Sequence, residues 1–176
     1  MSIRWPWKGR SLSVLLVCRA NVCRSPMAEA ILRHKLDIAG MGRRVQVASA
    51  GTHVNTGGQP PDPRVVAVLA ENGIPVKRGR SHSIRSADFE RHRFIIAMDR
   101  ENLEHLMKIC SASYQEKLHL VTAFSSGLPP EGIPDPYYGN TTGFEHVHEL
   151  LETALDGFLD NLLLPALLEQ EQENLS

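Results

Sequence analysis

Residues 14–29 read VLLVCRANVCRSPMAE: an apolar run, a short polar loop with two cysteines and two arginines, and then a helix start. The run Leu12–Val17 is nearly unbroken and rich in branched side chains, which is typical of a strand buried on both faces of a parallel sheet. Ser25 followed by Pro26 predicts a helix N-cap and a first helical residue, with apolar residues at helical spacing after them. The loop Cys18–Arg24 therefore connects a buried strand to an amphipathic helix.

This loop has the composition of an anion-binding site. Its backbone N–H groups precede a helix N-terminus, which carries about half a positive charge. Arg24 adds a planar fork that grips two oxygens of a phosphate. The same positive field favours the thiolate form of Cys18. The sequence therefore predicts a nucleophilic thiolate facing a bound phosphate or similar oxyanion. A nucleotide-triphosphate loop is excluded, because no Gly-Lys-Ser/Thr follows the strand.

At these residues the chain resembles a known family, the low-molecular-weight protein tyrosine phosphatases. The family signature is Cys-x-Gly-Asn-x-Cys-Arg-Ser, and residues 18–25 read CRANVCRS. Two further segments resemble the family in the same order: residues 49–64, which begin SAGT and end PDPR, and Asp135–Gly139, DPYYG. The likeness extends from Leu12 to Leu164. A bare Cys-x5-Arg spacing is weak evidence, but three matched motifs in order are strong evidence.

Strands that alternate with helices predict an α/β fold with a parallel sheet. Beyond the first strand, the sequence pattern predicts strands at Val45–Ser49, Phe94–Met98 and Leu118–Phe124. The resemblance adds the order 2-1-3-4 for a four-stranded sheet with helices on both faces, a flavodoxin-like architecture of the phosphotyrosine phosphatase I type. Ligands of such sheets bind at the carboxyl ends of the strands, where the Cys18 loop lies.

Capping residues predict where the other helices begin. Asp62, Asp99 and the Thr142–Glu145 pair are the N-terminal signals of three helices. Pro165 is expected to interrupt the last helix, and Glu169–Ser176 is expected to fray. On the two helices that begin at Asp62 and Asp99, the side chains expected to face inward are Val65, Val66, Leu69, Leu103, Leu106, Met107 and Cys110.

The resemblance implies the reaction and its catalytic residues. A phosphotyrosine protein phosphatase of this family hydrolyses phosphate monoesters through a phosphocysteine intermediate. Here Cys18 is the implied nucleophile and Arg24 the phosphate ligand, while Asp135 protonates the departing phenolate and then activates water. No metal and no other cofactor is expected, because Arg24, the backbone N–H groups and the helix end balance the charge of the anion.

The remaining loop residues are expected to bind phosphate or to support the loop. Ala20 stands where the family has glycine, so a positive φ there would cost on the order of 1–2 kcal/mol. Asn21 tolerates left-handed backbone geometry, and Ser25 is expected both to cap the helix and to donate a hydrogen bond to the Cys18 thiolate. Arg19 is expected at the rim, where it favours acidic substrates. The supporting set is Arg19, Ala20, Asn21, Val22, Cys23 and Ser25.

The resemblance also assigns a brace and a cleft wall. Ser49 matches a serine that braces the catalytic loop, although a hydroxyl bonded to its own strand end is an equal alternative. The predicted wall consists of Asn55, Tyr137 and Tyr138. Many members have an aromatic residue where this chain has Asn55, so we expect weaker selectivity for phosphotyrosine. The apolar Val22, by contrast, resembles the tyrosine phosphatases more than the related protein-arginine phosphatases, which carry threonine.

Two other functions remain as alternatives. An arsenate reductase uses a similar cysteine and arginine but needs further cysteines for a disulfide cascade, and here Cys110 is expected to be buried. A non-catalytic phosphoprotein-binding module is disfavoured because both Cys18 and Asp135 are present. The family also implies that Cys23 forms a protective disulfide with Cys18 under oxidation.

Composition bounds the class of protein. A chain of 176 residues with a net charge of -1 predicts one domain and does not suggest a nucleic-acid binder. Three cysteines form no disulfide framework and indicate a cytoplasmic protein. We expect no membrane span, and the apolar run before Cys18 is too short for a secretory signal. The expected division is an N-terminal extension at 1–11, a phosphatase domain at 12–165 and an acidic tail at 166–176.

The expected partner is a phosphotyrosine-containing protein. The resemblance suggests a bacterial tyrosine kinase of polysaccharide export, and it implies a monomer or a weak dimer. The basic stretch Lys77–Arg93 is expected to be a solvated surface without a site.

Overall fold

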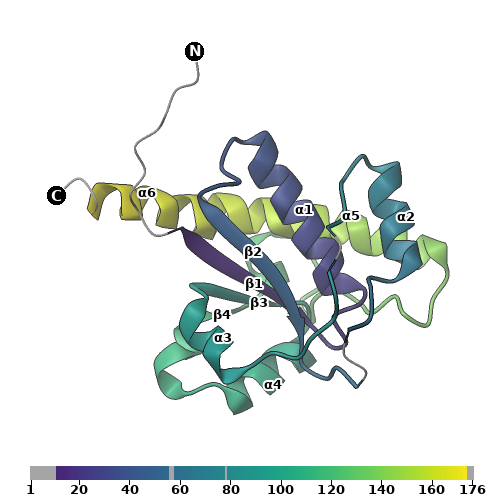
Figure 1. Ribbon diagram of the computed structural model, residues 1–176, viewed down its shortest axis with the longest axis horizontal. Coiled ribbons are helices and arrows are strands. Elements are labelled where there is room, and N and C mark those ends of the chain that lie inside the picture. Colours follow the sequence, from purple (N-terminus) through teal and green to yellow (C-terminus); the bar gives the residue numbers. More distant parts are fainter. Residues whose placement is uncertain (1–10, 56–57, 78, 174–176) are drawn as a thin grey trace.

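The structure is a computed structural model that describes residues 11–55, 58–77 and 79–173. Its sheet has four parallel strands in the order β2-β1-β3-β4. The strands are β1 (Leu12–Cys18), β2 (Val45–Gly51), β3 (Phe94–Ala97) and β4 (Leu118–Leu120). This confirms the expected sheet order and places β1 between two neighbours (Figure 1). The expected N-terminal extension, apart from Ser11, lies outside the described residues.

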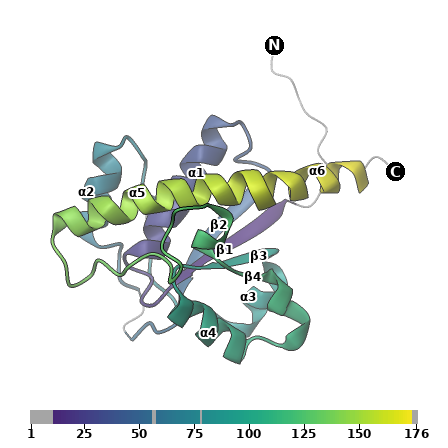
Figure 2. The same cartoon turned by 180° about the vertical axis from the view of Figure 1, so that it is seen from behind.

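Helices cover both faces of this sheet (Figures 1 and 2). One face carries α1 (Arg24–Ile38), α2 (Pro63–Glu71), α5 (Thr141–Phe158) and α6 (Leu164–Glu173). The other face carries α3 (Ser86–Arg91) and α4 (Arg100–Ile109). The α/β architecture is therefore confirmed, and the short α3 was not predicted.

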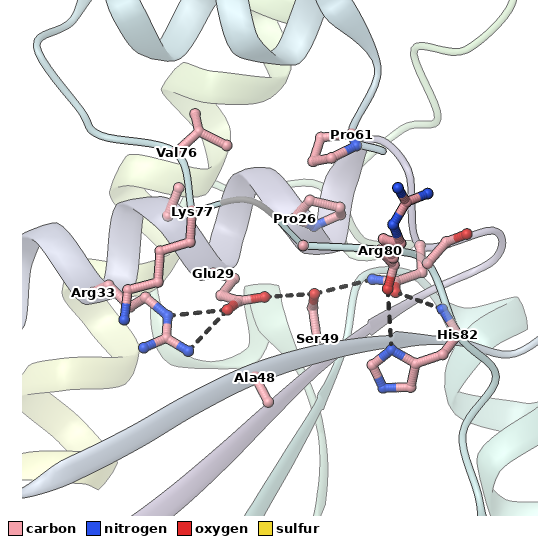
Figure 3. A pocket seen from close by; sticks show the side chains of 14 residues that line it. Pro26, Glu29, Arg33, Ala48, Ser49, Pro61, Val76, Lys77, Arg80 and His82 are labelled. Carbon is pink, nitrogen blue, oxygen red and sulfur yellow. Dashed lines mark hydrogen bonds and ion pairs between the residues drawn. The ribbon is translucent and has the colours of Figure 1, made fainter. Parts of the chain in front are cut away.

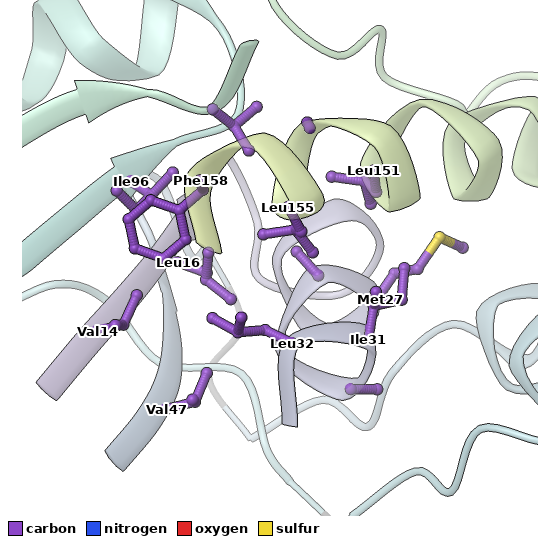
Figure 4. Close-up of a cluster of buried hydrophobic side chains, with 14 of the residues drawn as sticks. Val14, Leu16, Met27, Ile31, Leu32, Val47, Ile96, Leu151, Leu155 and Phe158 are labelled. Atoms are coloured by element: carbon purple, nitrogen blue, oxygen red, sulfur yellow. The ribbon is translucent and has the colours of Figure 1, made fainter. Parts of the chain in front are cut away.

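Every residue of β1 is buried, because its side chains alternate between two cores. Val14 and Leu16 pack into the larger core with Ile31 of α1 and Phe158 of α5 (Figure 4). Leu15 belongs to the smaller core, beneath α4. Full burial of such side chains stabilises the fold by about 1.5–3 kcal/mol each. This two-sided packing fixes the strand that ends at Cys18.

Several local predictions are wrong. β4 ends at Leu120, and residues Val121–Phe124 form a 3₁₀ turn instead of continuing the strand. The side chain of Asn140 caps α5 by accepting from the N–H of Gly143 at 3.2 Å, so the Thr142–Glu145 capping box is not formed. Val66 and Met107 face outward, at 40% and 48% exposure.

Burial also corrects the expectations for the basic stretch and for the C-terminal end. His92 is buried, so this residue is not part of a solvated surface. A π-helical turn at Leu159–Leu163 joins α5 to α6, and Pro165 falls in the first turn of α6, where proline is tolerated. Leu167 is buried, so α6 is docked against the core, and it continues through Glu173 where fraying from Glu169 was expected. None of the helices in the described part of the chain is long and apolar enough to cross a membrane.

Candidate active site

A cavity of about 360 Å³ opens at the carboxyl end of β1. Cys18 from the end of β1, Arg24 from the start of α1 and Asp135 from the loop before α5 all line it. The structure therefore brings the three predicted catalytic residues together. The other predicted residues on its wall are Arg19, Ala20, Val22, Cys23, Asn55, Tyr137 and Tyr138. His53, Val54 and Gln59 also line it, as the family resemblance implies for the loop from His53 to Gln59.

The catalytic loop turns at Asn21, which has a φ of 57°. Asn21 is the one non-glycine residue with positive φ in the described parts of the chain, as its side-chain type allows. Its side-chain oxygen accepts a hydrogen bond from the N–H of His82 at 3.1 Å. Ala20 therefore does not have positive φ, and the strain considered for replacing glycine at this position does not arise.

Ser25 forms a hydrogen bond with Cys18 and does not cap the start of α1. Its Oγ lies 3.0 Å from Cys18 Sγ and accepts a hydrogen bond from Asn21 Nδ2 at 2.9 Å. That acceptance leaves the hydroxyl proton available for Cys18 or for the Ala50 carbonyl at 3.3 Å. The predicted cap is wrong, because the N-cap position is Cys23, without a side-chain bond, and Ser25 is already inside the first turn.

Behind the loop, a row of hydrogen bonds fixes the direction of these contacts (Figure 3). Asn21 Nδ2 also donates to Ser49 Oγ at 3.0 Å, and Ser49 Oγ donates to Glu29 Oε2 at 2.6 Å. Arg33 Nε holds the other carboxylate oxygen of Glu29 at 3.0 Å. Ser49 is thus a brace of the loop, as the resemblance implied, and its hydroxyl does not turn back on its own strand. Glu29 and Arg33 were not predicted to take part.

Arg24 is the electrostatic centre of the cavity and is 2% exposed. Its NH1 pairs with Asp99 Oδ2 and donates to the Ile133 carbonyl at 3.0 Å, and its NH2 pairs with Asp135 Oδ2 at 2.7 Å. Burial alone would lower the pKa of Arg24, but the negative charges of Cys18, Asp135 and Asp99 outweigh burial and raise this pKa. Within the described residues, Arg24 Nε has no hydrogen-bond partner. A phosphate oxygen fits that buried donor.

Asp99 was predicted only as a helix cap, but it also holds Arg24 at the site. Its Oδ1 accepts from the N–H of Asn102 at 2.7 Å, which confirms the predicted cap of α4, while its Oδ2 holds Arg24. Its position in the sequence could have indicated this role, because Asp99 follows β3 and so lies at the same edge of the sheet as Cys18.

We expect Asp99→Asn to weaken both the fold and the site. Asparagine keeps the cap acceptor but removes a charge from beside the buried guanidinium, which costs about 2 kcal/mol. Urea unfolding should report this loss, and the inhibition constant of phosphate should rise because Arg24 is less well oriented. Asp88→Asn is the matched control, since Asp88 accepts from the N–H of Arg85 at 2.8 Å and does not line the cavity. Equal effects of the two substitutions would contradict the role of Asp99.

Cys23 lies in the same loop, and its thiol is buried. Burial, with the nearby charges of Asp62, Asp135 and Cys18, raises the pKa of Cys23 to about 12. Burial also raises the pKa of Cys110, which packs in the smaller core. Both thiols therefore stay protonated near neutral pH. The disulfide between Cys18 and Cys23 stays a prediction.

We expect iodoacetamide at neutral pH to modify Cys18 before either other cysteine, because a protonated thiol is a poor nucleophile. Peptide mass spectrometry after partial alkylation measures the order, and inorganic phosphate should slow only the Cys18 reaction. Equal labelling of Cys23 would contradict this expectation.

The mouth of the cavity is polar and aromatic. Arg19 lies at the exposed rim and pairs with Glu101 at 2.6 Å. Tyr137 and Tyr138 pack edge to face with ring centroids 5.0 Å apart, and Tyr138 is 97% exposed. Tyr138 therefore contributes almost nothing to the core, which leaves its ring available at the mouth.

At the end of a parallel α/β sheet, a loop thiol hydrogen-bonded to serine lies beside a buried arginine that pairs with a carboxylate, an arrangement that suits a phosphate group. Residues 13–173 match the family model described as low molecular weight phosphotyrosine protein phosphatase, and the chain belongs to this family. It is thus a protein-tyrosine phosphatase, a phosphoric monoester hydrolase.

Relatives of known sequence and structure agree with this membership. A putative low molecular weight protein-tyrosine-phosphatase of Synechocystis is 36% identical over 152 residues, which cover 86% of this chain and 96% of that protein. The Schizosaccharomyces pombe enzyme is 34% identical over 154 residues, with 87% and 98% covered. The Entamoeba histolytica phosphatase, solved with Hepes in its active site, has a TM-score of 0.84 at 32% identity, covering 89% and 99%. Vibrio vulnificus Wzb, solved with benzylphosphonate, has a TM-score of 0.75 at 27% identity, covering 87% and 100%.

Proposed function

We propose that Cys18, Arg24 and Asp135 carry the phosphatase reaction. The observation that supports this most is the shared cavity, in which Arg24 bridges to the Asp135 carboxylate beside the thiol of Cys18. Free N–H groups at the start of α1 add their partial positive charge to that of Arg24. Phosphate is the ligand whose charge and shape suit this arrangement.

In the first step the Cys18 thiolate attacks phosphorus and the bond from phosphorus to the phenolic oxygen breaks. Asp135 gives its proton to the departing phenolate, so that the leaving group is a neutral phenol. In the second step the Asp135 carboxylate takes a proton from water, and the hydroxide attacks phosphorus. The sulfur–phosphorus bond then breaks, which releases inorganic phosphate and restores the thiolate.

Arg24 changes partners during this cycle. The phosphoryl group accepts from Nε and NH2 of Arg24, and the NH2 contact competes with the present bond to Asp135. Asp99 keeps NH1 in place throughout. Substrate binding therefore releases Asp135 from Arg24 and frees its carboxyl group for the leaving oxygen.

The proposed substrate is a phosphotyrosine residue of a protein. The tyrosine pair at the mouth supports this, because aromatic rings stack on an aryl phosphate. The structure of Wzb in complex with benzylphosphonate, an aryl compound, also supports it. The partner that the family resemblance favours is a bacterial tyrosine kinase of polysaccharide export. The proposed location of this protein is the cytoplasm. The three unpaired thiols agree with that compartment.

The experiment is hydrolysis of a phosphotyrosine peptide and of its phosphoserine counterpart, each with EDTA present. We expect phosphate release from the phosphotyrosine peptide, unchanged by EDTA, and acid-quenched enzyme should carry phosphate on the Cys18 peptide. Thiol-dependent turnover of arsenate without ester hydrolysis would instead identify a reductase. The burial of Cys110 in the smaller core already disfavours the required thiol cascade.

A further inference from the structure

Arg64, in the first turn of α2, contacts both the residue that caps its own helix and the loop before α5. Its Nε and NH2 form a two-pronged contact with Asp62, at 3.0 Å to Oδ1 and 2.8 Å to Oδ2. Asp62 also caps α2 by accepting from the N–H of Arg64 at 2.9 Å. The contact with Arg64 lowers the pKa of Asp62. The guanidinium is therefore held in one orientation.

From that position Arg64 reaches the segment that carries the proposed acid. Its NH1 donates to the Gly139 carbonyl at 3.0 Å and its NH2 donates to the Tyr137 carbonyl at 3.2 Å. Its Cζ lies 4.3 Å from the centre of the Phe144 ring in α5. One side chain thus contacts the loop after Asp135 at two points and the helix that follows it.

The residues that Arg64 contacts on each side, Asp62 and Tyr137, are themselves hydrogen-bonded to parts of the active site. The N–H of Asp62 donates to the Val22 carbonyl of the catalytic loop at 2.9 Å. The N–H of Tyr137 donates to Asp135 Oδ1 at 3.2 Å. A continuous path therefore leads from the nucleophile's loop through Asp62 and Arg64 to the Asp135 carboxylate.

The need for this path follows from the chemistry of Arg24. Among the described residues, the other side-chain contact of Asp135 is with Arg24 NH2, and the substrate phosphate competes for that nitrogen. When phosphate is bound, Asp135 must stay over the leaving oxygen without the help of Arg24. Asp135 is also partly exposed, so core packing does not fix it.

We propose that Arg64 is a positioning residue for the general acid, which holds the segment from Asp135 to Gly139 against the catalytic loop. This proposal rests on the proposed function, in which Asp135 is the acid. The competing explanation is that the Asp62–Arg64 pair only stabilises the start of α2. Such a role would affect melting temperature and would not depend on the leaving group of the substrate.

The test compares Arg64→Gln, Arg64→Lys and Asp135→Asn on phenyl phosphate and p-nitrophenyl phosphate. Phenol is a poor leaving group, with an acidity close to that of tyrosine at a pKa of about 10, whereas nitrophenol departs without much protonation. The readout is kcat/KM, which reports steps up to loss of the phenol. Both substrates pass through the same phosphocysteine, so kcat does not distinguish them wherever hydrolysis of this intermediate limits turnover.

The matched control is Arg100→Gln. Arg100 is exposed and also donates to a loop carbonyl, that of Pro130 at 3.2 Å, but it does not line the cavity. Melting temperature and the inhibition constant of phosphate are measured for every variant. These two values show whether the fold and the Arg24 site are intact.

With Arg64→Gln we expect kcat/KM for phenyl phosphate to fall about 10-fold, and that for p-nitrophenyl phosphate about 2-fold, below the 10²–10⁴ available to a general acid. Arg64→Lys should rescue little, because an ammonium lacks the planar fork that makes these contacts together. Adding Arg64→Gln to Asp135→Asn should cost little more, since both changes remove one function.

Equal losses on the two substrates, or full rescue by lysine, would overturn the proposal for Arg64. Failure of the proposed function looks different. In that case Asp135→Asn itself would lower kcat/KM for both substrates by the same factor.

Discussion

Cys18→Ser is expected to abolish phosphatase activity, with kcat lowered by about 10⁴-fold or more. A serine hydroxyl is neutral near pH 7, so the loop supplies no anionic nucleophile, and no phosphoenzyme can form through sulfur. The substitution fits the site because Cys18 is 3% exposed and already contacts Ser25 Oγ. Steady-state hydrolysis of p-nitrophenyl phosphate measures the loss.

Binding should survive this substitution. Arg24 and the start of α1 are unchanged, so calorimetry should still detect a phosphotyrosine peptide on the Cys18→Ser variant. Cys110→Ser is the matched control, since Cys110 lies in the smaller core and does not line the cavity. It should keep nearly full activity. Activity of Cys18→Ser within 100-fold of the parent would rule out a thiolate nucleophile.

Asp135→Asn is expected to lower kcat/KM for phenyl phosphate by about 10²–10³-fold, in the range of general acid catalysis. Asparagine keeps an acceptor for the N–H of Tyr137 but has no proton to give and cannot activate water. The loss in kcat/KM should therefore be smaller for p-nitrophenyl phosphate, whereas kcat should fall for both substrates.

Asp160→Asn provides the comparison, because Asp160 is exposed on the π-helical turn. It should match the parent in both kinetic constants. An Asp135→Asn variant that retained activity on phenyl phosphate would assign the acid to another group. The same measurement supplies the reference against which the Arg64 variants are judged.

The strand, loop and helix around Cys18 could be predicted from sequence because each signal is local. A buried strand is recognised by its apolar run, and the catalytic loop by its residue types. The order of the strands came from the family resemblance, since no local pattern shows which strands pair. The predicted cleft residues Asn55, Tyr137 and Tyr138 do lie on one cavity.

Two errors at the site arose where one residue type serves two purposes. Serine and aspartate both cap helices and build sites, so Ser25 was predicted as a cap that it is not, and Asp99 was predicted only as a cap although it also holds Arg24. The hydrogen bonds that connect Ser49 to Glu29, and Glu29 to Arg33, bring β2 and α1 together across a gap in the sequence. Such contacts depend on tertiary packing and leave no periodic signal.

The central place of β1 also decides how the site responds to heat. Because β1 is buried and paired on both sides, we expect its amides to exchange with deuterium only when the whole domain unfolds. The segment around Asp135 belongs to a surface loop, whose amides exchange through small local openings. We therefore expect Cys18 to keep its position until the domain unfolds. A reversible loss of turnover below the melting temperature would then originate in local opening of the loop that carries Asp135.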